Sequence, residues 1–164
     1  MIEQTKGLNE ISITPKRILI PTDGSGNAAR AASVAIEYAR KFEAELFVLH
    51  VIAIPAHTLA LVEAGMEGLE SSETREYFAL ARQKAKTIVD EVVKSAEAKN
   101  VKATGIIQEY SFSVVETIVD HAAKYSVDLI VIGTKGLTGF KKLLVGSVSS
   151  GILNHAHCSV LIVR

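Results

Sequence analysis

The sequence predicts a single α/β domain in which helices cover both faces of a parallel β-sheet. Five short apolar runs alternate along the chain with four segments of helical periodicity. This alternation is typical of parallel sheets, because parallel strands need a long crossover between them, usually a helix. The apolar runs are continuous rather than alternating, which indicates strands buried on both faces. A length of 164 residues fits one domain.

The first half of the domain begins after a short arm. Residues 1–15 are expected to form a flexible N-terminal arm that ends at Pro15, ahead of a domain over residues 16–164. A strand is predicted over residues 17–21, a helix over 27–42 and a second strand over 45–51. The apolar positions of the helix recur at helical spacing and are mostly alanines: Ala28, Ala31, Ala32, Ala35, Ile36, Ala39 and Phe42.

The segment from Ile52 to Ser72 is too long for an ordinary loop of about 4–6 residues. Its scattered apolar residues are expected to form a lid, a short helix or a surface for a partner. A long helix with one apolar face is then predicted over residues 74–99, followed by a strand over 101–107.

The rest of the chain continues the same pattern. A helix is predicted over residues 113–125, and it begins with Ser113 and Glu116 at the spacing of a capping box. A strand over 128–132, a short helix over 147–155 and a last strand over 160–163 complete the domain. In such sheets, ligands bind beyond the carboxyl ends of the strands, where the strand order reverses.

Composition narrows the classes of partner and location. Lysine plus arginine equal aspartate plus glutamate at 18 each, so a nucleic acid or an anionic membrane is not the expected partner. The single cysteine, Cys158, excludes an intrachain disulfide and suits a reducing compartment. No apolar run is long enough to span a bilayer, and no secretion signal is visible. We therefore expect a cytoplasmic protein.

A glycine- and serine-rich segment after the fourth predicted strand indicates a phosphate site. Three glycines follow the strand, and the backbone can approach a ligand closely where no Cβ stands in the way. Gly146 and the hydroxyls of Ser147, Ser149 and Ser150 then open the next helix. Free N–H groups and the dipole at a helix N-terminus favour phosphate.

The better-known phosphate and catalytic motifs do not fit this chain. It has neither a Walker A loop nor the G-x-S-x-G nucleophile elbow. The loop after the first strand resembles the dinucleotide fingerprint only loosely, because Asp23 at the strand exit would repel a pyrophosphate. The second strand ends in His50 and Val51 rather than in the acid that holds a ribose. Ser25 is expected to cap the first helix, and Asp23 to hold ribose hydroxyls or a Mg²⁺ that accompanies phosphates.

The spacing Gly133-x2-Gly136-x9-Gly146-Ser147 resembles the mark of the nucleotide-binding branch of the universal stress proteins. The resemblance covers residues 17–164. It includes the opening from Ile18 to Ser25, the strand end Leu49-His50-Val51 and the closing segment from His155 to Arg164.

The resemblance implies an open, Rossmann-like five-stranded sheet of order 3-2-1-4-5 and a homodimer made through the C-terminal strand. It also implies that ATP binds between the ends of the first and fourth strands. Pro21, Thr22 and Asp23 would line the ribose and phosphate side, and Asp23 would meet any Mg²⁺ that arrives with ATP. Val51 and Ile132 would contact the adenine. The implied phosphate-binding residues are Gly133, Gly136 and Gly146 through their backbone N–H groups, Ser147 and Ser149 through their hydroxyls, and Val148 between them.

The sequence departs from the family pattern in two informative places. Residues 109–113 replace a Gly-x-Pro turn that often precedes the third helix of the family, which puts the start of that helix in doubt. Lys135 takes a position often held by arginine, so the charge is kept but the bidentate fork is lost. Lys141 and Lys142, which follow, either screen phosphate or are simply solvated.

Three functions agree with these features. The first is an ATP-binding protein with a regulatory role in a stress response. The second is a weak ATP hydrolase or phosphotransferase, although no catalytic residue is assigned, since neither a general base nor an arginine finger is identified. The third is a dimeric interaction module without a ligand that uses residues 52–72 as its contact surface. We expect the first, with slow hydrolysis at most.

Overall fold

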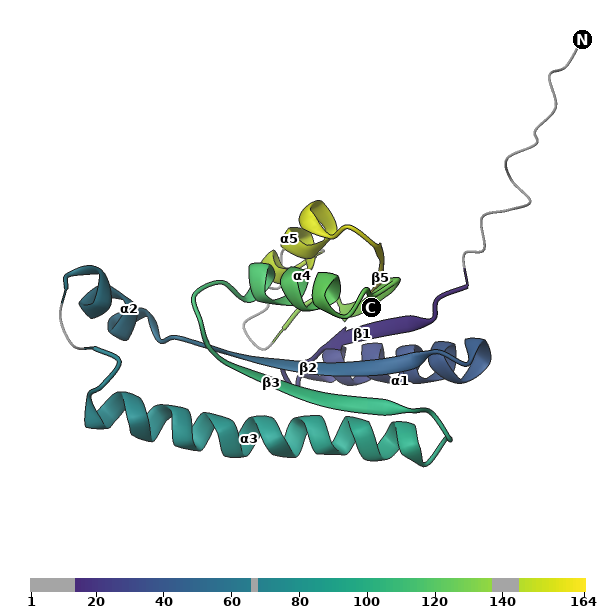
Figure 1. The fold of residues 1–164 in the computed structure, drawn as a ribbon, viewed down its shortest axis with the longest axis horizontal. Helices are drawn as coiled ribbons and strands as arrows, with labels where there is room; N and C mark the ends of the chain where they lie inside the picture. Colours follow the sequence, from purple (N-terminus) through teal and green to yellow (C-terminus); the bar gives the residue numbers. More distant parts are fainter. Residues whose placement is uncertain (1–13, 66–67, 137–144) are drawn as a thin grey trace, which may run out of the picture.

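The computed structural model of the chain describes residues 14–65, 68–136 and 145–164. The expected N-terminal arm therefore lies almost entirely outside the described residues, as do Lys141 and Lys142. The described chain forms a five-stranded parallel sheet of order β3-β2-β1-β4-β5, which confirms the predicted fold (Figure 1). Its strands are β1 (Arg17–Pro21), β2 (Glu45–Ala53), β3 (Ala103–Ser111), β4 (Leu129–Gly133) and β5 (Ser159–Val163). Its helices are α1 (Gly26–Phe42), α2 (Ala56–Glu63), α3 (Ser72–Glu97), α4 (Val114–Lys124) and α5 (Ser147–His155).

The strand order reverses between β1, the central strand, and its neighbour β4. β1 pairs with β2 along its whole length, whereas it pairs with β4 through Ile18 opposite Leu129 and Leu19 opposite Ile130. Because all pairs are parallel, the loops after β1 and β4 leave the same edge of the sheet. This reversal is where open α/β sheets bind their ligands.

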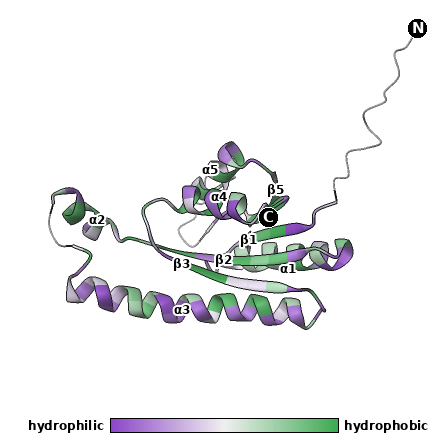
Figure 2. Cartoon of the chain, in the orientation of Figure 1, coloured by the Kyte–Doolittle hydropathy of each residue, from purple (hydrophilic) through white to green (hydrophobic). Residues whose placement is uncertain are grey.

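Helices cover both faces of the sheet, and each face has its own apolar core. α1 and α3 cover one face, where Ile18 and Ile20 of β1 pack against the alanine-rich side of α1. α4 and α5 cover the other, where Leu19 packs with Ile118 and Ile152. Figure 2 shows hydrophobic residues concentrated along the central strands. None of the helices in the described residues is long and apolar enough to cross a membrane.

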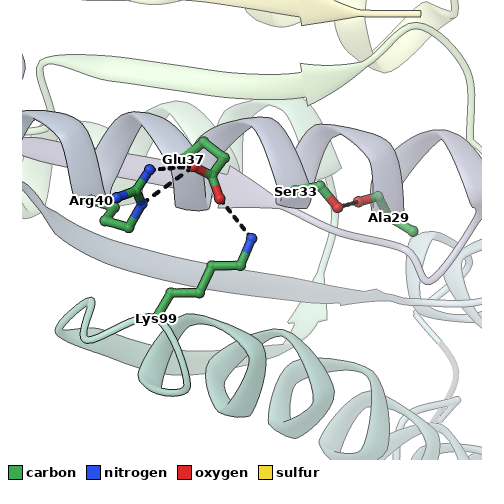
Figure 3. Close-up of polar contacts among 5 residues, drawn as sticks. All are labelled: Ala29, Ser33, Glu37, Arg40 and Lys99. Carbon is green, nitrogen blue, oxygen red and sulfur yellow. Dashed lines mark hydrogen bonds and ion pairs between the residues drawn. The ribbon is translucent and has the colours of Figure 1, made fainter.

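Glu37 links the two helices that share a face (Figure 3). Its carboxylate accepts a hydrogen bond from Lys99, just beyond α3, at 2.6 Å and from Arg40 of the same helix at 3.0 Å. These bonds, the one with Lys99 first, hold the pKa of Glu37 below its usual value. The pairs are exposed to solvent, where ion pairs contribute little to stability. The apolar core, rather than this link, therefore holds the helices on the sheet.

β2 and β3 are longer than predicted, because their ladder continues to Ala53 opposite Ser111. Next to this end, Tyr110 has a φ of 57°, in the left-handed region that non-glycine residues rarely adopt. Its ring stacks on that of Phe78 from α3, with the ring centroids 4.1 Å apart. Tyr110 lies within the residues that replace the family's Gly-x-Pro turn. Helix α4 still begins at the expected cap, where the Ser113 hydroxyl accepts from the Glu116 N–H at 3.3 Å.

The long segment after β2 contains a short helix, α2, one of the three alternatives predicted for it. The next helix, α3, starts two residues earlier than predicted. The reason is a cap that the sequence interpretation missed: the Ser71 hydroxyl accepts from the Thr74 N–H at 3.1 Å. Thr74 itself is buried and donates from its own hydroxyl to the Gly68 carbonyl at 2.8 Å, so the start of α3 is tied to the segment before it.

Candidate functional site

A cleft of about 990 Å³ lies at the carboxyl ends of β1, β2 and β4. It is lined from one side by the loop after β1 and from the other by the loop after β4 and the start of α5. All the residues that the sequence marked as a candidate site line this one cleft: Pro21, Thr22, Asp23, Val51, Ile132, Gly133, Gly136, Gly146, Ser147, Val148 and Ser149.

The loop after β1 is held by a set of short-range hydrogen bonds. The Asp23 Oδ1 atom accepts from the Ser25 N–H at 2.9 Å, and the Ser25 hydroxyl accepts from the Ala28 N–H at 3.2 Å. Ser25 therefore caps α1, as predicted. Gly24 between them has a φ of 78°, the left-handed conformation that glycine adopts most readily. The turn fixes the Asp23 carboxylate at the mouth of the cleft.

The loops after β1 and β4 meet across the cleft at Asp23 and Gly136. A Cβ atom built on Gly136 would lie only 2.5 Å from Asp23 Oδ2, closer than real Cβ contacts allow. The absent side chain of Gly136 therefore leaves room for the Asp23 carboxylate. Gly136 itself is exposed, so a side chain at this position would contact the Asp23 carboxylate and not the apolar core.

Gly133 packs closely against α1 as well as lining the cleft. A Cβ atom built on it would lie 2.8 Å from the backbone carbonyl carbon and oxygen of Asn27, in the first turn of α1. The end of β4 therefore packs directly on the backbone of α1. The missing side chain of Gly133 makes room for a helix, a packing role that adds to its predicted place in the cleft.

The N-terminus of α5 opens into the cleft. The Gly146 N–H donates to the Thr134 carbonyl at 2.6 Å, which sets the start of the helix against the loop after β4. The N–H groups of Ser147, Val148 and Ser149 belong to the first turn, where no intrahelical carbonyl can accept them. These three residues line the cleft. A helix N-terminus of this kind attracts anions.

The two serines of this turn differ in what their hydroxyls do. The hydroxyl of Ser149 is buried and donates to the Gly133 carbonyl at 2.8 Å, so its proton fastens α5 to the end of β4. Ser147 is exposed at the cleft. Ser147 therefore offers its hydroxyl and its backbone N–H to a ligand, and Ser149 offers its backbone N–H.

The walls of the cleft include residues that sequence reasoning did not find. Val114 and Ile118 of α4 contribute one apolar wall, and Tyr77 and Leu80 of α3 contribute another. Tyr77 and Leu80 are 41% and 63% exposed, and both lie off the buried stripe of α3. Large apolar residues on an otherwise polar helix face were therefore a signal in the sequence. The sequence does not show which edge of the sheet Tyr77 and Leu80 contact, because that depends on the topology of the sheet.

His50 lines the cleft from within β2, rather than from the end of the strand as expected. Its Nδ1 atom is buried and has no hydrogen-bond partner among the described residues. Burial lowers the pKa of His50, against the opposing effects of a backbone hydrogen bond with Thr22 and of the Asp23 carboxylate. With a pKa below that of a free imidazole, His50 is neutral at pH 7 and adds no charge to the cleft.

The charged groups of the cleft suit an anion better than a metal cluster. Among the described lining residues, Asp23 is the one carboxylate, and Lys84 and Lys135 supply positive charge. No set of three or more histidine, cysteine, aspartate or glutamate side chains that could hold a metal occurs in residues 14–65, 68–136 and 145–164. A lone carboxylate fits Mg²⁺ that is bound mainly through the phosphates of a substrate.

The fold and the cleft define a doubly wound α/β protein with a cleft at the switch point of the sheet, where such proteins bind their ligands. The chain belongs to the universal stress protein family, whose sequence model matches residues 14–164. Universal stress protein MJ0531 of Methanocaldococcus jannaschii is 33% identical over 150 residues, which are 91% of this chain and 82% of that protein. The family resemblance inferred from the motif spacing is thereby confirmed.

Solved structures agree with this assignment. Hypothetical protein MJ0577 superposes with a TM-score of 0.70 at 26% identity, over 92% of this chain and 96% of its own. A universal stress protein in complex with cAMP is 22% identical, with a TM-score of 0.62 over 92% of this chain and 98% of its own. The universal stress protein from Archaeoglobus fulgidus in complex with dAMP is 20% identical, with a TM-score of 0.64 over 90% of this chain and 97% of its own. At these identities, the last two establish a shared fold.

Proposed function

We propose that this protein binds an adenine nucleotide in the cleft, that ATP with Mg²⁺ is the preferred ligand, and that binding serves a regulatory role in a stress response. The observation that carries the proposal is that the N-terminus of α5 and the Asp23 carboxylate line the same cleft. The first-turn N–H groups, the Ser147 hydroxyl and the Lys135 amine are donors for phosphate oxygens. Asp23 supplies an acceptor for ribose hydroxyls or a ligand for the Mg²⁺ that accompanies the phosphates.

The remainder of the cleft suits a purine and a ribose. Val51 from β2 and Ile132 from β4 offer apolar surface on which a flat ring can pack. The cleft volume of about 990 Å³ lies at the upper end of the range typical for small-molecule sites. The cAMP and dAMP complexes of two proteins with this fold support an adenine mononucleotide as the common part of the ligand.

The proposed role is regulatory rather than catalytic. Transfer of the γ-phosphate needs a group that activates or orients the nucleophile, together with positive charge on the transferring phosphate. The described lining of the cleft has the single carboxylate of Asp23, and Asp23 is assigned to ribose or Mg²⁺. His50 also lines the cleft, but its Nδ1 atom is buried, so that nitrogen is not offered to a reacting atom.

The proposal includes a homodimer that forms through β5 in the cytoplasm. β5 is the edge strand next to β4, and its residues Val160 to Val163 are apolar yet only partly buried. An exposed apolar edge strand invites pairing with another chain. Cys158, a free and partly buried thiol, suits a reducing compartment.

Equilibrium titration of the purified full-length chain with Mg-ATP and with AMP tests the proposal. We expect saturable binding of one nucleotide per chain, with Mg-ATP bound more tightly than AMP. An absence of saturable binding at millimolar nucleotide would overturn it. In parallel, release of phosphate should stay at the level of contaminating activity, and a steady turnover that is lost in Asp23→Ala would instead identify a hydrolase.

A further inference from the structure

A second, smaller cavity adjoins the main cleft and is lined by positive charge. It has a volume of about 400 Å³ and shares Lys135 with the main cleft. The residues that line it are Asn27, Arg30, Thr134, Lys135 and Arg164. Three of these five side chains are cationic, and no carboxylate side chain is among them.

Backbone packing holds the three cations around this cavity. Arg30 comes from α1, Lys135 from the loop after β4, and Arg164 follows β5. The Thr134 N–H donates to the Val163 carbonyl at 2.9 Å, which ties the loop to β5. The contact of Gly133 with the Asn27 backbone ties the same loop to α1. The fold therefore brings the three cationic residues together at one place on the surface.

None of the three cationic side chains of this cavity forms an ion pair with a carboxylate side chain in residues 14–65, 68–136 and 145–164. The ion pairs that the described residues form lie elsewhere, on Glu37, Glu45, Asp90 and Glu109. Arg30 donates to the Asn27 amide oxygen, which leaves the Asn27 NH₂ group free to donate as well. The lining is thus rich in donors and in mutually repelling charges, and a bound anion would relieve that repulsion.

We propose that this cavity is an oxyanion subsite that binds a phosphate group. A guanidinium presents paired N–H donors that match two phosphate oxygens, and the Lys135 amine adds a point charge. Three cations suit a multiply charged oxyanion better than a single carboxylate. The phosphate belongs either to the distal end of the nucleotide in the main cleft, in which case the subsite rests on the proposed function, or to a separate phosphate compound. Lys135, which lines both cavities, is the connection between the two sites.

The variant Arg30→Gln tests the subsite, with Arg40→Gln as its matched control. Both variants remove one arginine charge from α1, and ten residues of helix place Arg40 about 15 Å away. Inorganic pyrophosphate, titrated by calorimetry at fixed ionic strength, is the first probe. We expect Arg30→Gln to weaken its binding about tenfold, the effect of losing one charge-assisted hydrogen bond, and Arg40→Gln to leave it unchanged.

Titrations with Mg-ATP and AMP then identify the source of the phosphate. If the subsite holds distal phosphates of the nucleotide, Arg30→Gln weakens Mg-ATP about tenfold but not AMP, and Mg-ATP displaces pyrophosphate. If it holds a separate anion, pyrophosphate binds alongside Mg-ATP, whose affinity the variant does not change. Pyrophosphate binding that depends on Arg30 in a protein that binds no nucleotide would support the subsite and refute the proposed function. Binding of pyrophosphate and of Mg-ATP that is equal in Arg30→Gln and wild type would overturn the subsite.

Discussion

Gly133→Ala is expected to lower the free energy of unfolding by about 1–3 kcal/mol, the usual cost of inserting a methyl group into a closely packed site. The new Cβ would meet the backbone of Asn27 at 2.8 Å. Backbone atoms cannot swing aside as the end of a side chain can, so β4 and α1 would have to move apart. Urea denaturation followed by circular dichroism measures the change as a shift of the midpoint.

Gly26→Ala is the matched control for this substitution. Gly26 is the first residue of α1, and a Cβ atom built on it meets nothing within 4 Å. Its free energy of unfolding should stay within about 0.5 kcal/mol of wild type, as for most surface substitutions. Equal stabilities of Gly133→Ala and Gly26→Ala would show that the contact between β4 and α1 is not as close as the structure has it.

Gly136→Val is expected to weaken the binding of Mg-ATP about 10- to 100-fold while leaving the fold intact. The substitution fills the space between the loop after β4 and the Asp23 carboxylate, where a Cβ atom would already lie 2.5 Å from Oδ2. Displacing Asp23 and crowding the cleft should cost the ligand about 1–3 kcal/mol, and each 1.4 kcal/mol is tenfold in affinity. Calorimetric titration with Mg-ATP provides the measurement.

Two comparisons make this second result specific to the cleft. The urea midpoint of Gly136→Val should equal that of wild type, because Gly136 is exposed and the clash involves a carboxylate rather than the backbone or the apolar core. Gly26→Ala, which does not line the cleft, should bind Mg-ATP with wild-type affinity. A Gly136→Val protein that is folded and binds Mg-ATP as tightly as wild type would show that the nucleotide does not pass between the two loops.

Much of the fold was predictable because its signals are local. The strand over residues 17–21 and the helix over 147–155 have the predicted bounds, since a short apolar run and a serine-opened segment mark them. The start of α3 was predicted too late, because the capping hydroxyl of Ser71 lies in a segment without clear periodicity. The left-handed backbone conformation of Tyr110 was not predictable. It is accompanied by stacking of the Tyr110 ring on Phe78, a residue that is distant in the sequence.

The candidate site was predictable in its membership but not in the roles of its members. Motif spacing located the loops, and the structure brings every predicted residue to one cleft. The same spacing cannot tell that Gly133 makes room for α1 whereas Gly136 makes room for Asp23. Nor does it reveal the wall from α3, because that contact depends on how β2 and α3 are placed by the whole sheet. Roles that depend on distant neighbours follow from the packing, not from the pattern.

The central claim is that the phosphates of an adenine nucleotide bind at the N-terminus of α5, opposite Asp23. The most direct test is a ¹H–¹⁵N spectrum of the assigned protein, recorded during titration with Mg-ATP. We predict that the largest shifts fall on the backbone N–H groups of Ser147, Val148 and Ser149, with a second group at Asp23 and its turn. Saturable shifts confined to another surface, with the first turn of α5 unchanged, would contradict the claim.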